Sequence, residues 1–142
     1  MKRIKKYLLP ALVVLLLAGV YAYREYHRKP ADLTSFKPVA EMNAVELAGL
    51  YEADESKANS LYLGKAIDVK GTIADIQNQQ DTMINILLGN KDAMHRVSCL
   101  MNMDHAAGIK KYKPGDAVTI RGICTGYLMD VELNRCVIIN NK

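Results

Sequence analysis

The chain has 142 residues, half of them hydrophobic, so it is long enough to form one domain with a packed core and too apolar to be disordered. Its formal net charge of +4 is unevenly distributed. Residues 1–29 hold seven Lys or Arg and one acid, whereas residues 30–142 hold twelve bases and fourteen acids, a net charge of −2. A nucleic-acid-binding domain normally concentrates positive charge on its folded part, so this distribution argues against that class.

The N-terminal segment has the pattern of a membrane helix. Four bases precede an uncharged, apolar run at residues 7–23, and tyrosines at both ends of the run suit the membrane interfaces. As a helix, this run would span about 26 Å, slightly less than the thickness of a bilayer core. We therefore expect a transmembrane helix over 7–23 that acts as a signal anchor, after a basic cytoplasmic stub at 1–6.

A cleaved signal peptide is the alternative to this anchor. Val20-Tyr21-Ala22 loosely fits a small-x-small cleavage site, but bulky Tyr21 precedes Ala22 and charged Arg24 follows closely, so we favour the uncleaved anchor. No cysteine lies near the end of the apolar run, which argues against a bacterial lipoprotein anchor. Four bases precede the run and three bases with one acid follow it, so the positive-inside rule places the N-terminus in the cytoplasm. We expect a single pass through the inner (cytoplasmic) membrane, with the C-terminal domain outside the cytoplasm.

Two segments are expected between the membrane and the main domain. Residues 24–41 carry Pro30 and Pro38, several charges and no apolar periodicity, which is typical of a juxtamembrane tether. Asn43 is a candidate helix cap with a Glu three positions later, and apolar residues follow at helical spacing. We expect a helical lead-in at 42–63 that contains one or two helices.

Two eight-residue stretches nearly repeat each other, Gly64-Lys-Ala-Ile-Asp-Val-Lys-Gly71 and Gly115-Asp-Ala-Val-Thr-Ile-Arg-Gly122. In each, apolar residues fall at alternate positions, which is the period of a half-buried strand. Gly71 and Gly122 lie within this alternation, where the missing side chain permits a bulge or a sharp bend. Such a pair of strands suits a small closed barrel.

The barrel is expected over residues 64–142, with five strands and a short helix between the third and the fourth. The predicted strands lie at about 65–76, 82–89, 96–102, 117–125 and 131–140, and the predicted helix at about 104–111. Polar turns at 78–81 and 89–92 separate the first three strands, and Lys113-Pro-Gly-Asp116 has the signature of a type II turn. Three strands, a helix and two strands is the order of the OB-fold, a mainly β, five-stranded Greek-key barrel.

Four stretches within and just before this domain carry further information. They read Ala58-Asn-x-x-Tyr-Leu-Gly-Lys65, Lys113-Pro-Gly-Asp-x-Val-x-Ile-x-Gly122, Gly122-Ile-Cys-Thr-Gly-Tyr127 and Asp130-Val-Glu-Leu-Asn-Arg-Cys136. Together they resemble the tRNA_anti-like family of OB-fold proteins, over roughly residues 42–140. The resemblance implies an OB-fold in a small exported or membrane-attached bacterial protein, and it implies no particular ligand.

The three cysteines, Cys99, Cys124 and Cys136, all lie on expected strands. A domain outside the cytoplasm meets oxidising conditions, which would allow one disulfide and one free thiol. Cys124 and Cys136 lie symmetrically about Asp130 and become cross-strand neighbours if the last hairpin turns there, which predicts a Cys124–Cys136 bridge. Cys99 is a competitor, because the third strand of an OB barrel runs beside the fifth. Three buried, reduced thiols are the remaining alternative.

Residues 94–105 hold three Met, two His and one Cys, which are soft ligands that would suit Cu(I). Strand alternation offers a simpler interpretation, because most of these side chains share one face and would fill the barrel. The residues on that face are Val97, Cys99, Met101 and, at the strand end, Met103. His95 and His105 would lie about 30 Å apart on a straight strand, too far to share a metal. We therefore expect neither a metal site nor a cofactor.

The sequence lacks the aromatic and basic residues with which OB-folds bind nucleic acid. Such folds stack bases on aromatic side chains of the second and third strands beside a basic groove. Residues 82–103 contain no Phe, Tyr or Trp, and their only bases are Lys91 and Arg96. We expect Tyr127 at a barrel end or in a loop, and we expect Asp130 to bond the backbone of a tight loop rather than to act in acid–base catalysis. No catalytic motif is present, so we expect no enzyme.

The barrel is therefore expected to be a membrane-anchored binding or assembly module of the bacterial envelope. Its weakly acidic charge, its lack of aromatic residues on the second and third strands and its membrane anchor favour another envelope protein or an extended peptide as the partner. The alternatives are nucleic-acid or oligosaccharide binding by the barrel face, and a purely structural stalk in a larger envelope complex.

Overall fold

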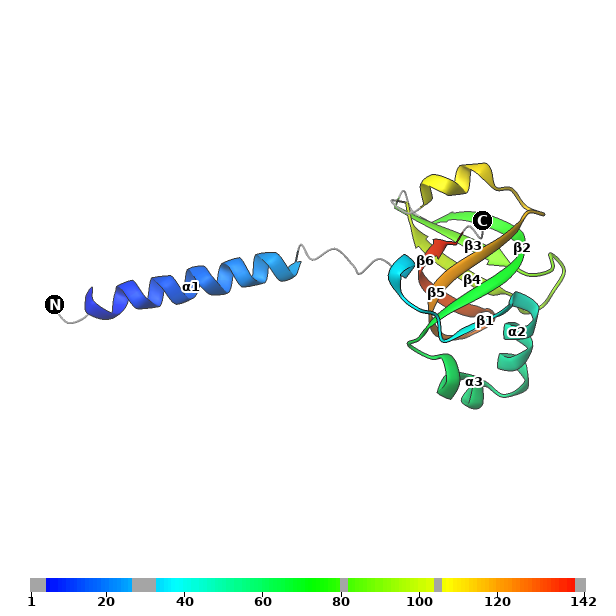
Figure 1. Cartoon of the computed structure of the whole chain (residues 1–142), viewed down its shortest axis with the longest axis horizontal. Helices are drawn as coiled ribbons and strands as arrows, with labels where there is room; N and C mark the ends of the chain where they lie inside the picture. The colour runs from blue at the N-terminus through cyan, green and yellow to red at the C-terminus, as the bar shows by residue number, and fades with distance from the viewer. Residues whose placement is uncertain (1–4, 27–32, 80–81, 104–105, 140–142) are drawn as a thin grey trace. The chain divides into compact units, whose positions relative to one another are not determined.

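The computed structural model of the chain describes residues 5–26, 33–79, 82–103 and 106–139 (Figure 1). It divides the chain into two units, Met1–Ala31 and Asp32–Lys142. Over these described residues, the first unit contains one helix and the second contains the strands.

The helix of the first unit is α1, Lys5–Tyr26. It contains the whole of the predicted segment 7–23 and extends past it at both ends, so the helical structure of that segment is confirmed. Several of its apolar side chains are more than half exposed, namely Val14, Leu15, Leu16, Leu17 and Val20. Over the described residues, no helix is both long enough and apolar enough to cross a bilayer. The membrane span and its topology stay predictions.

Over the described residues, the second unit is a mainly β, closed barrel with the 3-10 helix η1 (Leu33–Ser35) and two α-helices before it and one short 3-10 helix within it. The strands are β1 (Ala40–Asn43), β2 (Ala66–Gln79), β3 (Met83–Leu88), β4 (Val97–Asn102), β5 (Ala117–Tyr127) and β6 (Val131–Ile138). The helices are α2 (Ala44–Ala53), α3 (Glu55–Tyr62) and the 3-10 helix η2 (Ala106–Lys111) between β4 and β5. Five strands close the barrel in the order β2-β3-β4-β6-β5, because β5 also pairs with β2, and β1 adds a parallel strand beside β2. The predicted OB-fold order is confirmed.

The two glycine-bounded repeats pair with each other. β2 runs antiparallel to β5, with Ala66 opposite Ile123 and Thr72 opposite Ala117. The alternate apolar residues of both strands belong to the buried core, among them Ile67, Val69, Val118 and Ile120. The two similar stretches of sequence therefore form two similar strands, whose pairing closes the barrel.

The glycines of these strands serve different purposes. Gly122 falls at a register shift between β5 and β6, as expected for a bulge. Gly71 allows close packing instead, because a Cβ at this position would lie 2.9 Å from the Cβ of Ala44. Gly115, in the turn before β5, has a φ of +100°, as the predicted type II turn requires.

Helices close both ends of the barrel. Figure 1 shows α2 and α3 at one end and η2 at the opposite end. Leu47 and Tyr51 of α2 are buried, and so is Ile109 of η2. The helix α2 begins at Asn43, whose side-chain oxygen accepts a hydrogen bond from the Val45 amide at 3.1 Å, which confirms the predicted cap.

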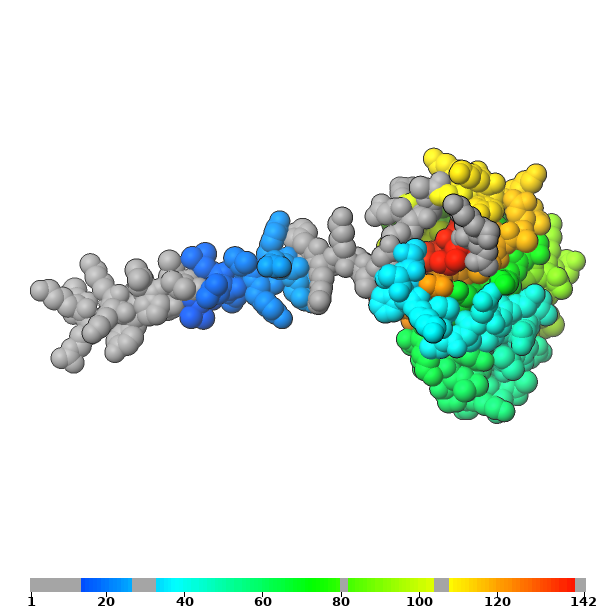
Figure 2. All heavy atoms as spheres, in the orientation of Figure 1, coloured from blue at the N-terminus to red at the C-terminus, as the bar shows by residue number. Residues whose placement is uncertain are grey.

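The segment predicted as a tether up to residue 41 folds in part against the barrel instead. Leu33–Ser35 form the 3-10 helix η1, and β1 begins at Ala40. η1 packs against β5 and β6, and Figure 2 shows the cyan atoms of this segment against the orange and red atoms of those strands. Leu33 is only 2% exposed. The sequence pattern missed this segment because one apolar side chain and several backbone carbonyls hold it, and neither produces a periodic signal.

The contacts of Arg121 hold this segment in place. The guanidinium of Arg121 forms a bidentate pair with Asp68, with Nε 2.6 Å from Oδ1 and Nη2 2.7 Å from Oδ2. Its Nη1 donates to the carbonyl oxygens of Phe36 at 2.5 Å and Thr34 at 3.3 Å. The side chains of Arg121 and Asp68 are only 12% and 9% exposed, and the hydrogen bond to Asp68 raises the pKa of Arg121. One guanidinium thus joins β2, β5 and η1.

Candidate functional site

The outer face of β2, β3 and β4, where OB-folds commonly bind ligands, is polar and slightly acidic. We call this surface the sheet face, and its residues are Asp75, Gln77, Asn85, Leu87, Ser98 and Leu100. The Ser98 hydroxyl lies 2.9 Å from Asn85 Oδ1 and donates to it, and Asn85 itself is only 7% exposed. These six residues include no aromatic ring and no base, so the face offers bases no platform for stacking and phosphates no positive charge.

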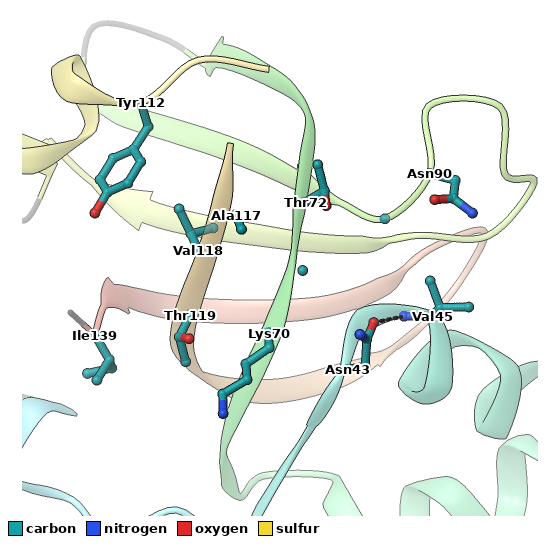
Figure 3. Close-up of a pocket in the computed structure, with 12 residues that line it drawn as sticks. Asn43, Val45, Lys70, Thr72, Asn90, Tyr112, Ala117, Val118, Thr119 and Ile139 are labelled. Carbon is teal, nitrogen blue, oxygen red and sulfur yellow. Dashed lines mark hydrogen bonds between the residues drawn. The ribbon is translucent and has the colours of Figure 1, made fainter. Parts of the chain in front are cut away.

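A pocket of about 540 Å³ opens across β2 and β5. Figure 3 shows Lys70 and Thr72 on β2 beside Val118 and Thr119 on β5, with Tyr112 at one side of the opening. The remaining lining residues are Asn43, Val45, Gly71, Gly89, Asn90, Ala117 and Ile139. The pocket lies where the neighbour of β2 changes from β1 to β3, so its floor is a single pair of strands.

The polar groups of this pocket are mostly engaged already. Lys70 forms an ion pair with Glu41 of β1, and the Asn43 side chain caps α2, as the dashed line in Figure 3 shows. The carbonyl oxygen of Thr72 accepts a hydrogen bond from the Gly89 amide at 2.9 Å. Hydroxyl groups of Thr72 and Thr119 on neighbouring strands could bind a small polar ligand. Because the charge of Lys70 is balanced by Glu41, the pocket is poorly suited to a phosphate.

A second candidate surface lies at the end of the barrel that α2 closes. The β3–β4 loop and the β5–β6 turn meet there, and we call these two loops, residues 89–96 and 128–130, the apex. Hydrogen bonds join them: His95 Nδ1 lies 2.9 Å from the carbonyl oxygen of Met129, and the Arg96 amide donates to Asp130 Oδ1 at 2.8 Å. The apex is therefore an ordered surface, although both of its parts are loops.

Tyr127, Tyr51 and Glu52 connect the apex to the barrel and to α2. The Tyr127 hydroxyl lies 2.9 Å from His95 Nδ1, and His95 Nε2 lies 3.8 Å from Glu52 Oε1 of α2. The ring of Tyr127 packs against that of Tyr51 with a centroid distance of 5.6 Å. The Tyr51 hydroxyl in turn lies 3.0 Å from the buried Cys124 sulfur. This chain of contacts connects the apex to the core.

The electrostatic environment of the apex is acidic. Burial raises the pKa of Tyr127, and the nearby carboxylates of Glu52, Asp130 and Glu55 raise it further. Within the apex, Lys91 and Arg96 balance Asp92 and Asp130, and Arg96 Nε lies 3.9 Å from Asp130 Oδ1, so Glu52 and Glu55 add two negative charges beside it. The apex thus has more negative than positive charge around it.

Three large apolar side chains project from the apex into solvent. Met94 is 86% exposed, Leu128 is 79% exposed and Met129 is 78% exposed. We call these three residues the apex patch. Exposed apolar side chains are common when scattered singly, but these three lie on loops that are hydrogen-bonded to each other and flanked by carboxylates. The arrangement is typical of a protein-binding surface.

The predicted roles of Tyr127 and Asp130 agree with this arrangement. Tyr127 is the last residue of β5, at a barrel end, as expected. Asp130 accepts a hydrogen bond from a loop backbone, as expected, but the donor belongs to Arg96 of the neighbouring loop rather than to its own turn. The side chain of Asp130 therefore joins two loops instead of closing one.

The structure contains all three cysteines as buried free thiols. Cys124 lies opposite Leu133 rather than opposite Cys136, because the register of β5 against β6 shifts at two places. Cys136 lies instead against Gly122, and a Cβ added to Gly122 would be 2.7 Å from the Cys136 sulfur. The expected cross-strand placement of Cys124 and Cys136 is therefore wrong, and the bridge between them stays a prediction without support from the register.

The soft-ligand cluster of residues 94–105 separates in space. Cys99 and Met101 are buried in the core as expected, whereas Met103 is 44% exposed instead of filling the barrel. His95 belongs to the apex, and His105 lies outside the described residues. In the part of the chain that the structure describes, no group of three or more His, Cys, Asp or Glu could hold a metal ion.

The apex was not predicted from the sequence, because its parts are far apart along the chain. His95 and Tyr127 are separated by 32 positions, and only the closed barrel brings them together. One local signal was present in the chain. Leu128 and Met129 are two adjacent apolar residues in a hairpin turn, where polar and glycine residues are usual.

Comparisons with known proteins agree with the observed barrel. The sequence model of the tRNA_anti-like family matches residues 1–138. A lipoprotein of Klebsiella pneumoniae, proposed to bind nucleic acid, has a solved structure similar to this one. The TM-score is 0.59 at 19% identity, over 79% of this chain and 100% of that chain. At this identity the likeness shows the fold alone. No curated protein sequence matches the chain.

Asparaginyl-tRNA synthetase of Entamoeba histolytica is also similar in part. Its structure aligns with a TM-score of 0.43 at 16% identity, over 56% of this chain and 21% of that chain. In its complex with asparaginyl-adenylate the TM-score is 0.48 at 14% identity, over 75% of this chain and 25% of that chain. This chain therefore spans a quarter of the synthetase or less.

Proposed function

Because this chain belongs to the tRNA_anti-like family of OB-fold proteins, we propose that it is a membrane-anchored binding module of the bacterial envelope, without catalytic activity, whose barrel docks another protein. The observation that carries this proposal is the apex patch. Met94, Leu128 and Met129 are each more than three-quarters exposed on two loops that hydrogen bonds hold together. A folded chain keeps large apolar side chains in such a position when a partner covers them.

The charges around the apex indicate the chemistry of the partner. Glu52, Glu55 and Asp130 lie near Tyr127, and Arg96 lies near Asp130. A partner that buries the apex patch without repulsion must bring apolar side chains flanked by Lys or Arg. The expected partner is therefore a protein segment with a small apolar centre and a basic rim.

The sequence of α1 supports the membrane anchor. The run at residues 7–23 contains no charged residue and follows four bases, so the helix would enter the membrane with its N-terminus in the cytoplasm. The barrel would then lie outside the cytoplasm, next to the inner membrane. Partners and ligands would come from the envelope.

Methyl NMR of the full-length chain in detergent micelles tests the docking surface. The methionines are built-in probes, because Met94 and Met129 belong to the apex while Met83 and Met103 are exposed elsewhere, at 39% and 44%. The titrant is a synthetic amphipathic peptide with a leucine centre and lysine flanks, and the control peptide carries glutamate at the lysine positions.

We expect the methyl signals of Met94 and Met129 to shift with the lysine peptide and to stay unchanged with the glutamate peptide. Met83 and Met103 should stay unchanged with both peptides, because they lie outside the apex. Equal shifts at all four methionines, equal effects of the two peptides or no shifts at all would each overturn the proposal.

Thiol labelling in whole cells tests the topology separately. Single cysteines at Glu55 and Lys142, in a chain whose own three cysteines are replaced, are exposed to a reagent that passes the outer envelope but not the inner membrane. We expect both positions to be labelled. Protection of both positions would place the barrel in the cytoplasm and contradict the proposed location.

Nucleic-acid or oligosaccharide binding is the second candidate function. The pocket of about 540 Å³, with Lys70 and the hydroxyls of Thr72 and Thr119, is the observation in its favour. If nucleic acid were the ligand, its affinity would fall steeply with salt concentration, because binding would release counterions. We expect no such binding, since Lys70 is already paired with Glu41 and the sheet face has no base.

A further inference from the structure

His95 is the side chain that joins the two loops of the apex to each other and to the barrel. Its Nδ1 lies 2.9 Å from the carbonyl oxygen of Met129 and 2.9 Å from the Tyr127 hydroxyl. Its Nε2 lies 3.8 Å from Glu52 Oε1. The side chain of His95 is 28% exposed, so its ring can exchange protons with water. One imidazole therefore contacts a turn, a strand and a helix.

The partners of His95 differ in the hydrogen bonds that they can form. The carbonyl oxygen of Met129 only accepts, so its contact with Nδ1 requires a proton on Nδ1. The carboxylate of Glu52 also only accepts, so a lone pair on Nε2 would face a negative charge. The Tyr127 hydroxyl can donate or accept, so it can hold the ring in every protonation state. Met129 and Glu52 therefore favour protons on different nitrogens.

A neutral imidazole carries one proton and can meet only one of these two demands. With the proton on Nδ1, the lone pair of Nε2 faces the carboxylate of Glu52. With the proton on Nε2, the carbonyl oxygen of Met129 loses its donor. The imidazolium carries both protons, so it donates to Met129 and turns a positive charge toward Glu52. The geometry around His95 therefore fits the protonated ring best.

The other charged and titratable groups around the site are Tyr51, Glu55, Lys91, Asp92, Arg96 and Asp130. Arg96 is paired with Asp130, and Lys91 is followed by Asp92, so these four charges balance. Glu55 adds a negative charge, which favours the imidazolium. Burial raises the pKa of Tyr51 and that of Tyr127, so both phenols stay neutral where imidazoles titrate. The surrounding charges thus act in the same direction as Glu52.

We propose that His95 is a proton-controlled latch between the two loops of the apex, closed when its imidazole is protonated and released when it is neutral. When Nδ1 loses its proton to water, the ring keeps the proton on Nε2 beside Glu52. Nδ1 then accepts a hydrogen bond from Tyr127, and Met129 is released. Because Met129 belongs to the apex patch, the latch sets how firmly this patch is held, a consequence that rests on the proposed docking function. The latch itself needs no partner.

Nuclear magnetic resonance of the unchanged full-length chain in detergent micelles, at about pH 5.5 and about pH 8, tests the latch without a partner. Ring nitrogen signals show which nitrogen carries a proton, and those of His95 are identified by their absence from His95→Asn. Hydrogen exchange is followed at the amides of Arg96 and Leu128, which are both hydrogen-bonded within the apex. The reference is the Ile73 amide, which donates to the carbonyl oxygen of Asp116 at 2.9 Å. Exchange is expressed as protection factors, which remove the intrinsic effect of pH.

We expect the protection of Arg96 and Leu128 to fall about fivefold from the lower to the higher pH, because an ordinary hydrogen bond changes an opening equilibrium by about this factor. The protection of Ile73 should stay unchanged, and the neutral ring of His95 should carry its proton on Nε2. A neutral ring protonated on Nδ1 would overturn the proposal. Equal protection of the apex at both pH values, or an equal fall at Ile73, would overturn it as well.

Two matched variants locate the effect. His95→Asn supplies an amide N–H in place of the Nδ1 proton and does not titrate, so its apex protection should be the same at both pH values. Glu52→Gln removes the negative charge that keeps the proton of the neutral ring on Nε2, so the fall in protection should shrink. A full fall in His95→Asn would assign the effect to another group, and a full fall in Glu52→Gln would exclude this carboxylate as its cause. Either result would contradict the latch.

Discussion

Two apolar surfaces lie on the outside of this barrel, and they differ in exposure: one is covered by the chain itself and the other is exposed. The first lies on β5 and β6 and is covered by η1, so that Leu33 is 2% exposed and Val137, the cross-strand neighbour of Arg121, is 6% exposed. The second is the apex patch, where Leu128 is 79% exposed. Over the described residues, no segment of the chain covers the apex patch.

The first apolar surface is covered by a segment of the same chain, whereas the second is left open to a partner. At the first surface, Arg121 pairs with Asp68 and donates hydrogen bonds to the carbonyl oxygens of Thr34 and Phe36, which holds the covering segment in place. At the apex, hydrogen bonds such as that of His95 to Met129 hold the loops and leave the side chains free. Substitutions at the first surface should therefore affect folding, and those at the second should affect binding.

Removal of the Arg121 side chain should have the largest effect. Arg121→Met leaves the buried carboxylate of Asp68 without a partner and releases η1, which should lower the free energy of unfolding by about 3 kcal/mol. For a folded unit of this size, the thermal midpoint should fall by about 10–20 °C. Circular dichroism during heating measures this change. The control is Lys70→Met, which breaks a half-exposed ion pair and should cost less than about 1 kcal/mol. If both variants lost the same free energy of unfolding, the Arg121–Asp68 pair would have no special role in holding η1.

A matched pair of leucine substitutions compares the two surfaces directly. Leu33→Ala removes a buried side chain and should cost about 2–3 kcal/mol of unfolding free energy, because it leaves a cavity between η1 and the barrel. Leu128→Ala should change it by less than about 0.5 kcal/mol, since the side chain is exposed in the folded state. Denaturant titration measures both. A large loss for Leu128→Ala would mean that the apex patch serves the fold.

Alkaline pH should destabilise the barrel from the end that supports the apex. Burial raises the pKa of Tyr51 above its ordinary value of 10.0, and the hydrogen bond to Cys124 raises it further. Below pH 10 the phenol is protonated in both states, so its contribution to stability is complete. Above pH 10 the unfolded chain loses the proton more readily than the folded chain. Stability should then fall by up to about 1.4 kcal/mol for each pH unit until the folded pKa is reached.

Cys136 should add a similar loss from a lower pH. Its pKa is raised by burial and by Cys99, from an ordinary value of 9.0. Unfolding free energies measured from pH 8 to pH 11 check the combined slope. Tyr51→Phe should make the curve above pH 10 less steep, and an unchanged slope in that variant would exclude Tyr51 as the cause.

A smaller effect on stability than those of Arg121→Met and Leu33→Ala is expected for the support of the apex. Tyr127→Phe removes the hydroxyl that lies 2.9 Å from His95 and should cost about 1 kcal/mol. Because His95 also holds Met129, the amides of residues 128–130 should exchange with deuterium faster in this variant. Unchanged exchange would show that the order of the apex is independent of Tyr127.

The barrel could be predicted because its signals are local. The alternation in the two glycine-bounded repeats predicts β2 and β5, and Asn43 predicts the start of α2. The placement of Cys136 failed because it depends on a count of residues across a hairpin. Each bulge between β5 and β6 changes that count, and no pattern in the sequence reveals how many bulges the hairpin contains.

The features outside the barrel walls depend on long-range closure. η1 is held by Arg121, and the two are more than eighty positions apart. The apex needs His95, Tyr127 and Glu52, which come from a loop, a strand and a helix. Such contacts follow from the three-dimensional path of the strands, which a periodic pattern does not specify.

Photo-crosslinking in living cells tests the docking role of the apex most directly. A photoreactive amino acid is introduced into the full-length chain at Leu128 of the apex patch or at Gln77 of the sheet face. We predict a discrete, protease-sensitive adduct at Leu128 that disappears when Met129 is changed to Asp, and no adduct at Gln77. An adduct at Gln77 alone, a nuclease-sensitive adduct at either position, or no adduct at Leu128 would contradict the account.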